Sequence, residues 1–264
     1  MDLKLEGKKA LVTGSTGGIG LAIAELLSKE GAEVIINGRS HERVRQAIES
    51  IQSKSGKKNV TGIVADLGQA SGVKKLLSEL DSVDILINNM GYYEAKSFFD
   101  ISDEDWFKIY EANVLSGVRL SRHYMKGMLD RNWGRIIFIS SESGVQTPAE
   151  MIHYGMSKTA QLAVARGLAE LTAGTQVTVN SVLPGPTRSE GVEQFVAQVA
   201  TERGVAADTI EKEFFQTVRP SSLLKRFATS EEVANMVAYL SSDLASATNG
   251  TSVRVDGGTV RSIV

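Results

Sequence analysis

The segment "HYGMSK" places a tyrosine and a lysine four residues apart, at Tyr154 and Lys158. Residues at this spacing share one face of a helix, with Cβ atoms roughly 5–6 Å apart. A free phenol has a pKa of about 10, and a neighbouring ammonium favours its ionised form. The pair therefore predicts a phenol that exchanges a proton with a substrate, although taken alone it is equally compatible with a structural role.

A second chemical signal is the glycine-rich segment "TGSTGGIG", residues 13–20, with glycines at positions 14, 18 and 20. Glycine allows a tight turn and a close approach of the backbone to a pyrophosphate, while the start of the following helix attracts the anion. The segment predicts a loop that binds the phosphates of a dinucleotide. The alternative is a tight turn that binds nothing.

The end of the second predicted strand, "IINGRS", bears on which dinucleotide is bound. An acidic residue there would bind the adenosine ribose, but this chain has Gly38 followed by Arg39. A guanidinium offers a planar fork to a phosphate, so NADP is predicted and NAD remains possible; otherwise Arg39 is a solvated surface residue. Asp66, which ends the third strand, could contact the adenine or cap the next helix.

The elements that must position these residues follow a regular alternation. Short β-branched runs are separated by helical patterns, which indicates βαβ units and a parallel sheet covered on both faces. The prediction is an α/β fold, a doubly wound Rossmann-type parallel sheet of about seven strands with helices on both faces, in a single domain over residues 1–264. The strands are expected near residues 9–14, 33–38, 60–66, 83–89, 134–141, 176–185 and 251–258.

Two segments stand apart from this alternation. A long helical stretch is expected over 101–131, where Ser102 and Asp105 form the pattern of a capping box. Residues 187–222 are polar and contain glycine, and the segment is too short for a core of its own. We therefore interpret 187–222 as a substrate lid.

Several motifs together are similar to those of the short-chain dehydrogenase/reductase family over essentially the whole chain. In order and spacing they are "TGSTGGIG", "INNMG" (87–91), "YEANVLSG" around Asn113, "IFISSESG" (137–144), "YGMSK" and "VLPGPT" (182–187). Two positions depart from the pattern: Met90 stands where alanine is usual, and Thr187 lies closer to the preceding Pro-Gly than is common. Either could reshape the surroundings of the nicotinamide.

The resemblance implies a catalytic role for four residues. Tyr154 would be the proton donor, and Lys158 would lower its pKa and bind the nicotinamide ribose. Ser141, thirteen residues before the tyrosine, would orient the carbonyl, and alternation along the strand lets only one of Ser140 and Ser141 face the site. Asn113 would hold a water that links the lysine to solvent, unless it is a helix residue that faces outward.

The resemblance also implies contacts with cofactor and substrate. The cofactor-binding set is Gly14, Ser15, Gly18, Ile19, Gly20, Arg39, Asp66, Leu67, Asn88, Gly91, Tyr154, Lys158, Pro184, Gly185 and Thr187. The candidate substrate contacts are Ser141, Tyr92, Tyr93, Gln146 and His153, with a packing role for His153 as its alternative. The predicted function is an NAD(P)-dependent oxidoreductase that interconverts a carbonyl and an alcohol. The competing hypothesis is a non-catalytic nucleotide sensor or scaffold, although such a protein should have lost one of the catalytic groups.

Composition narrows the partners. With 29 Lys+Arg against 31 Asp+Glu, the net charge of -2 favours neither nucleic acid nor anionic membrane. The chain has no cysteine and only three isolated histidines, so no metal site is expected. No secretory signal and no run of about 18 apolar residues is found, which predicts a cytoplasmic protein acting on a small molecule. The family resemblance implies a homotetramer that buries the carboxyl-terminal segment 253–264.

Overall fold

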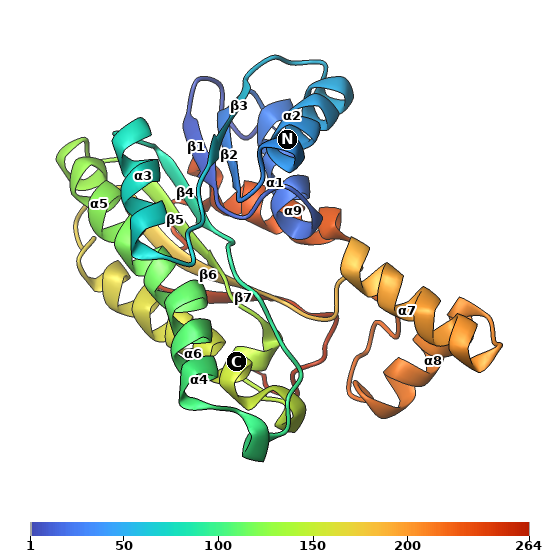
Figure 1. Ribbon diagram of the computed structural model, residues 1–264. Helices are drawn as coiled ribbons and strands as arrows, with labels where there is room; N and C mark the ends of the chain where they lie inside the picture. Colours follow the sequence, from blue (N-terminus) through green and yellow to red (C-terminus); the bar gives the residue numbers. More distant parts are fainter. Residues whose placement is uncertain (1, 264) are drawn as a thin grey trace.

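The computed structural model describes residues 2–263, apart from the side chain of Phe195, so Val264 at the end of the carboxyl-terminal segment lies outside the described residues. Seven parallel strands form one sheet in the order β3-β2-β1-β4-β5-β6-β7, which confirms the predicted fold (Figure 1). The order reverses between β1 and β4, and ligands of such sheets bind at the carboxyl ends of the strands beside that reversal. The strands are β1 (Lys9–Val12), β2 (Glu33–Gly38), β3 (Val60–Val64), β4 (Ile85–Asn88), β5 (Gly134–Ile139), β6 (Val177–Pro184) and β7 (Ser252–Val255).

Helices cover both faces of the sheet, and each face has its own apolar core. Successive strand residues point to opposite faces, so Ala10 and Val12 enter one core while Leu11 enters the other. The first core is closed by α1 (Gly18–Lys29), α2 (His41–Ser55) and α9 (Ser230–Leu240), and the second by α3 (Ala70–Glu79), α5 (Ser116–Asp130) and α6 (Ile152–Glu170). Within residues 2–263, none of the helices is long and apolar enough to cross a bilayer.

The helical stretch predicted over 101–131 is present but is interrupted by a π-helical turn. It consists of α4 (Asp103–Tyr110), the π segment η2 (Glu111–Leu115) and α5. The capping box is confirmed, because the Ser102 hydroxyl accepts from the Asp105 amide at 3.2 Å and Asp105 accepts from the Ser102 amide at 3.0 Å. Single π-helical turns are frequent at functional sites, and this one contains Asn113.

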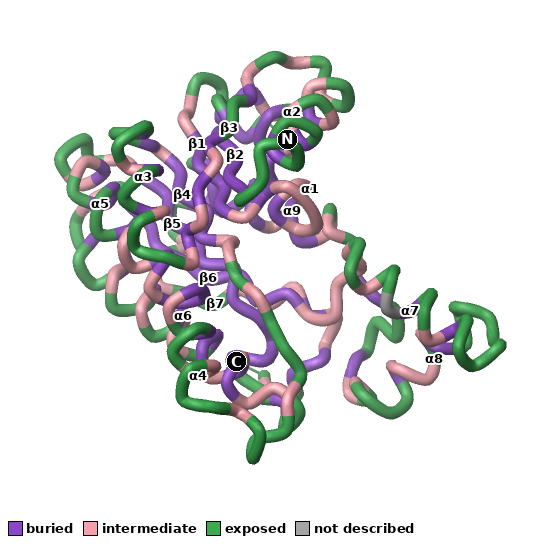
Figure 2. Tube along the Cα trace, in the orientation of Figure 1, coloured by how far each residue is buried: buried purple, intermediate pink, exposed green. Residues whose placement is uncertain are grey.

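Two helices, α7 (Glu190–Arg203) and α8 (Ala207–Thr217), form a hairpin that projects from the body of the molecule (Figure 1). Figure 2 shows that much of its surface is exposed, whereas β1, β4, β5 and β6 are mostly buried. The hairpin encloses a small apolar cluster with Phe227 from the chain that follows it: Val196, Ala200, Ile210, Phe215 and Phe227.

Candidate active site

The glycine-rich loop lies between β1 and α1 and leaves the start of that helix accessible. Gly14 has a φ of +59°, which favours glycine, and a Cβ on Gly20 would lie 2.7 Å from the Gly14 carbonyl oxygen. The helix begins at Gly18 after Gly17, and no side chain caps its first amides. Unpaired amides at a helix start bind anions, so the loop fits the pyrophosphate of a dinucleotide.

Ser15, predicted to bind cofactor, instead joins two strands. Its hydroxyl donates to the Val12 carbonyl at 2.6 Å and accepts from the Asn37 amide at 3.0 Å. Its own amide donates to the Asn37 carbonyl at 2.9 Å, and the residue is fully buried. Because each of these polar groups already has a partner within the fold, Ser15 presents none of them to a ligand.

The end of β2 has room for a phosphate-binding side chain but not for a carboxylate at position 38. A Cβ on Gly38 would lie 2.5 Å from Thr16 Cγ2, so an acidic side chain there would collide with the loop. Arg39 is exposed, and a second guanidinium, on Arg43 in the first turn of α2, lies 3.4 Å from the Cβ position of Gly17. Arg43 was not predicted, although it stands one helical turn after Arg39 in the sequence. Arg43 therefore lies beside the loop, and Arg39 follows the strand that ends at the expected adenosine end.

The turn after β3 is closed by Asp66. Its carboxylate accepts from the Gly68 amide at 3.1 Å, while the residue before α3 is Gln69. Asp66 therefore shapes the turn ahead of α3 and does not cap that helix, and its partly exposed position leaves it able to meet an adenine. Leu67 is buried in the second core, so only its backbone could contact a cofactor.

At the end of β4, the structure corrects the prediction for Asn88. The Asn88 side chain is buried and donates to Ser121 on α5 at 3.1 Å, so it points away from the glycine-rich loop. Asn89 makes the connection instead, donating to the carbonyls of Thr13 at 2.9 Å and Gly14 at 3.0 Å. Consecutive residues of an extended chain face opposite sides, which explains why the neighbour holds the loop.

Tyr154 and Lys158 lie on one face of α6, as their spacing predicts. The Lys158 ammonium is 5.6 Å from the centroid of the Tyr154 ring. Ser141 follows β5, and its hydroxyl is near enough to the Tyr154 phenol to lower the pKa of that phenol, while it donates to Glu142 at 3.1 Å. The Ser140 hydroxyl instead donates to the Lys158 carbonyl at 2.9 Å, so Ser141 is the serine that faces the phenol. A Cβ on Gly91 would be 3.6 Å from the ammonium, which places the loop after β4 beside the same group.

Burial dominates the electrostatics of this pair. It raises the pKa of Tyr154 to about 12, an effect that the Ser141 hydroxyl opposes and the negative charge of Glu142 reinforces. Burial also lowers the pKa of Lys158 to about 7. The expectation that the ammonium lowers the phenol's pKa does not hold for the chain by itself, because removal from water disfavours the charged form of both groups.

Asn113 and Gln161 form the layer behind the lysine. The Asn113 amide donates to Ser157 at 2.9 Å and to the Tyr92 carbonyl at 3.0 Å, so its side chain faces inward. Gln161 accepts from the Lys158 ammonium at 3.3 Å and donates to the Asn113 carbonyl at 2.6 Å. Gln161 therefore links Lys158 to Asn113, the two residues that the resemblance implies are connected through a water. Gln161 was not predicted, although it lies three residues after the lysine on the same helix face.

Of the predicted substrate contacts other than Ser141, Tyr93 packs against the Tyr154 ring, and the other three lie in different surroundings. Tyr93 packs edge-to-face against Tyr154 with ring centroids 6.1 Å apart, whereas the backbone of Tyr92 is bound to Asn113. Gln146 is exposed. His153 is fully buried and packs against Trp106 of α4, so its surroundings favour the packing alternative. Tyr93 is thus the tyrosine that adjoins the phenol.

The end of β6 leads from the sheet toward the α7–α8 hairpin. Pro184 ends the strand, and a Cβ on Gly185 would lie 2.6 Å from the Asp256 carbonyl oxygen. The Thr187 hydroxyl donates to the Gly185 carbonyl at 2.9 Å. All three residues therefore follow a strand at the carboxyl edge of the sheet, where the phosphate loop and Ser141 also lie.

Comparison with known proteins identifies the family. Residues 8–200 match the family described as short chain dehydrogenase. The chain belongs to the short-chain dehydrogenase/reductase family. YvrD of Bacillus subtilis (strain 168), named as an uncharacterized oxidoreductase, is 48% identical over the full length of both chains. The 3-oxoacyl-(acyl-carrier-protein) reductase FabG of Aquifex aeolicus (strain VF5) is 35% identical over 98% of this chain and 99% of its own.

A solved structure agrees with this assignment. The L-sorbose reductase of Gluconobacter frateurii, in complex with NADPH and L-sorbose, is 31% identical, and the two chains superpose over their full lengths with a TM-score of 0.92. Membership of this family makes the present short-chain dehydrogenase/reductase an oxidoreductase that uses a nicotinamide cofactor.

Proposed function

We propose that this protein interconverts a carbonyl and an alcohol using NADP(H), with Tyr154 as the acid/base. The observation that carries the proposal is the meeting of three groups at the carboxyl edge of the sheet. The Ser141 hydroxyl lies near enough to the Tyr154 phenol to lower its pKa, and the Lys158 ammonium lies 5.6 Å from the ring. A zinc-free carbonyl reduction needs a proton donor and hydrogen bonds to the oxygen as it becomes negative, which these side chains can supply.

Each of the four proposed catalytic residues has a separate task. When bound at the glycine-rich loop, the reduced dinucleotide supplies the hydride. Ser141 and Tyr154 hydrogen-bond the substrate oxygen, and the phenol gives its proton to that oxygen as charge develops. Lys158 stabilises the resulting phenolate, while Asn113 and Gln161 hold the lysine side of the site. A phenol with a pKa of about 12 keeps its proton at neutral pH, which suits it to carbonyl reduction.

The preference for NADP(H) rests on the end of β2. Gly38 leaves no space for an acidic side chain, the exposed Arg39 follows it, and the Arg43 guanidinium lies beside the loop. A 2′-phosphate would be bound by such guanidiniums, and the L-sorbose reductase of similar structure was solved with NADPH.

The preference is tested by titrating the wild-type protein and Arg39→Ala with NADPH and with NADH. The wild type should bind NADPH more tightly, and the substitution should weaken NADPH binding by about tenfold while changing NADH binding little, since a charged hydrogen bond is lost only with the phosphate. Equal weakening of both would contradict the assignment. A panel of ketones and aldehydes then tests turnover. If none of them causes NADPH oxidation although NADPH binds, the result would favour the sensor hypothesis.

A further inference from the structure

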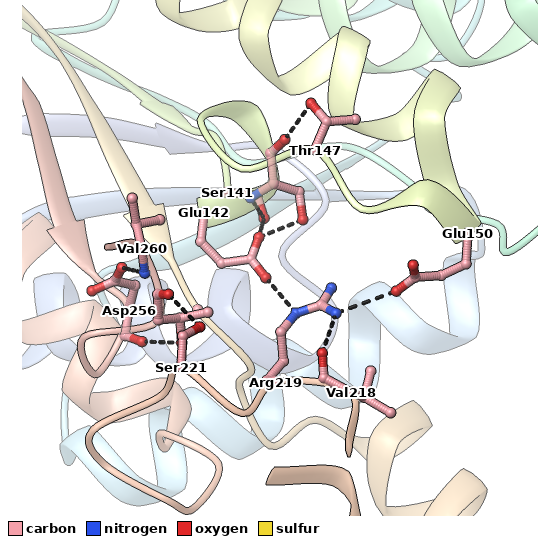
Figure 3. A network of polar contacts seen from close by, with 12 residues as sticks. Ser141, Glu142, Thr147, Glu150, Val218, Arg219, Ser221, Asp256 and Val260 are labelled. Carbon is pink, nitrogen blue, oxygen red and sulfur yellow. Dashed lines mark hydrogen bonds and ion pairs between the residues drawn. The ribbon is translucent and has the colours of Figure 1, made fainter. Parts of the chain in front are cut away.

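A buried carboxylate stands directly beside the proposed carbonyl-orienting serine. Glu142 follows Ser141 in sequence and is 5% exposed. One of its oxygens accepts hydrogen bonds from the Ser141 hydroxyl, at 3.1 Å, and from the Ser143 hydroxyl. Figure 3 shows the Glu142 side chain extending from Ser141 toward Arg219. The proposed functions of Ser141 and Tyr154 do not require this carboxylate.

The counter-ion of Glu142 comes from the chain that leaves the α7–α8 hairpin. Arg219 Nε donates to the second Glu142 oxygen at 3.0 Å, and Arg219 Nη1 donates to Glu150 at 3.2 Å and to the Val218 carbonyl at 3.0 Å (Figure 3). The Arg219 side chain is 12% exposed, and that of Glu150 is 50% exposed. The guanidinium is therefore shared between two carboxylates.

The sharing leaves a net charge of about −1 on this cluster, since two carboxylates face one guanidinium. The charge reaches the reacting groups, because Glu142 contributes to the raised pKa of Tyr154. The proposed catalytic cation, Lys158, is directed elsewhere and donates to the Ile139 carbonyl at 2.9 Å and to Gln161. Within residues 2–263, Arg219 is the only side chain that forms an ion pair with Glu142, and Arg219 also pairs with Glu150. A substrate held by Ser141 thus meets a buried carboxylate whose charge is only partly balanced.

We infer that the site selects neutral, polyhydroxylated ketones over ketones that carry a carboxylate or phosphate; the inference rests on the proposed carbonyl reduction. A carboxylate accepts about four hydrogen bonds. Ser143 and Arg219 make two of them, and Ser141 makes a third until its hydroxyl turns to a bound carbonyl, so a substrate hydroxyl can donate to Glu142. An anionic substituent in the same place would face a like charge with little water to screen it. Contact between two like charges weakens the binding of the wrong ligand and so contributes strongly to selectivity.

The test compares two probes of matched carbon skeleton. The rate of NADPH oxidation is measured with L-sorbose and with 5-keto-D-gluconate, and 2,3-butanedione serves as a small neutral reference ketone. We expect kcat/KM for L-sorbose to exceed that for the keto acid by about tenfold or more, as one unscreened like-charge contact requires.

The Glu142→Gln variant removes the charge and keeps the shape. It should reduce the preference for L-sorbose by about tenfold, mainly by lowering KM for the keto acid, because repulsion acts on binding. Glu150→Gln is the matched control at the half-exposed partner and should change the preference less. NADPH affinity of each variant, measured by fluorescence, shows that the cofactor site is intact.

Two results would overturn the inference while leaving the proposed function in place. One is a wild-type preference for the keto acid, which would assign Arg219 to anion recognition. The other is an unchanged preference in Glu142→Gln with normal NADPH affinity. Failure to reduce any ketone, the reference included, would overturn the proposed carbonyl reduction and this inference together.

Discussion

Tyr154 is buried enough that its pKa reaches about 12, whereas the buried Lys158 has a pKa of about 7. Removal from water therefore separates two pKa values that are nearly equal in solution, so that the phenol holds its proton more tightly than the lysine does. A neutral phenol next to a lysine that titrates near physiological pH is ready to donate a proton, and the charge of the lysine then decides how well the phenolate is tolerated.

The role of the phenol is tested by Tyr154→Phe. We expect kcat for ketone reduction to fall by about 10²–10⁴-fold, the usual contribution of general acid catalysis. NADPH affinity should change little, because only the hydroxyl is removed and the ring keeps its contact with Tyr93. Stopped-flow turnover and a fluorescence titration measure the two quantities, and retention of activity would show that another group supplies the proton.

Gln161 should set the pH range of reduction through Lys158. The rate falls as the pH rises through the lysine pKa, since the ammonium that stabilises the phenolate is lost. Gln161→Leu removes an acceptor of the charged form and should move this decline to lower pH, whereas Gln161→Glu adds a negative charge and should move it to higher pH. Profiles of kcat/KM from about pH 6 to pH 9 show the shifts.

A purely structural role for Gln161 has a different signature. Both variants would then lose rate by a similar factor at every pH, and the position of the decline would stay where it is in the wild type. Melting temperatures measured on the same samples separate that outcome from a change in proton affinity.

Spacing alone distinguished Ser141 from Ser140, because the distance along the chain to Tyr154 decides which hydroxyl faces the phenol. Spacing could not predict the sign of the phenol's pKa shift, since that depends on how much water the folded chain removes. The roles of Asn89 and Gln161 were also missed. Each depends on a partner distant in sequence, the loop carbonyl of Gly14 and the carbonyl of Asn113.

At the scale of elements, α2 and α7 meet above the glycine-rich loop. Arg43 in the first turn of α2 pairs with Glu190, the first residue of α7, at 3.4 Å. Both side chains are more than half exposed, so the pair itself contributes at most about 1 kcal/mol. Its position matters more than its strength, because the guanidinium proposed to bind the 2′-phosphate is the one that pairs with the first residue of α7.

Release of Arg43 from this pair should favour NADPH. We expect Glu190→Gln to tighten NADPH binding by up to about fivefold, within the range of an exposed ion pair, and to leave NADH binding unchanged. Fluorescence titration measures both affinities. Glu193→Gln, an exposed residue in the first turn of the same helix, is the matched control, and an equal gain for NADH would argue against competition between Glu190 and the phosphate.

At the scale of the whole molecule, several large apolar side chains are uncovered. Phe98 and Phe99 precede α4 and Phe107 lies on it, with exposed fractions of 52%, 92% and 74%. Leu223 and Ile263 near the carboxyl terminus are also exposed. Exposed apolar groups that cluster in this way mark contact surfaces. We propose, in line with the family resemblance, that copies of this chain cover them in a homotetramer.

Light scattering coupled to gel filtration tests the assembly. The wild type should have about four times the 28.4 kDa mass of one chain. Phe107→Glu should lower that mass, because a buried unpaired charge in an interface costs more than the contact provides. Lys126→Glu on the exposed side of α5 is the charge control, and a wild-type mass of one chain would contradict the proposal.

The sheet and its helices could be predicted because hydrophobic periodicity records which face of each element is buried. The loop at residues 13–20 and the capping box at Ser102 could also be predicted, because each depends only on residues close together in the sequence. The π-helical turn at 111–115 and the cluster inside the α7–α8 hairpin were not predictable in this way. The first is a register change within a continuous helical pattern, and the second needs Phe227, which lies beyond the segment that periodicity set apart.

The small apolar cluster shared by α7 and α8 bears on how substrate could enter. A segment with internal packing moves as one rigid piece, so opening would turn the hairpin about its two stems and would not unravel its helices. The stems are joined by a β-bridge between Thr187 and Ala228 and by a hydrogen bond from the Ser230 hydroxyl to the Arg188 carbonyl at 3.2 Å. The substrate site would then be either open or closed, depending on rotation at these stems. The side chains of the hairpin would keep the same relative arrangement in both states.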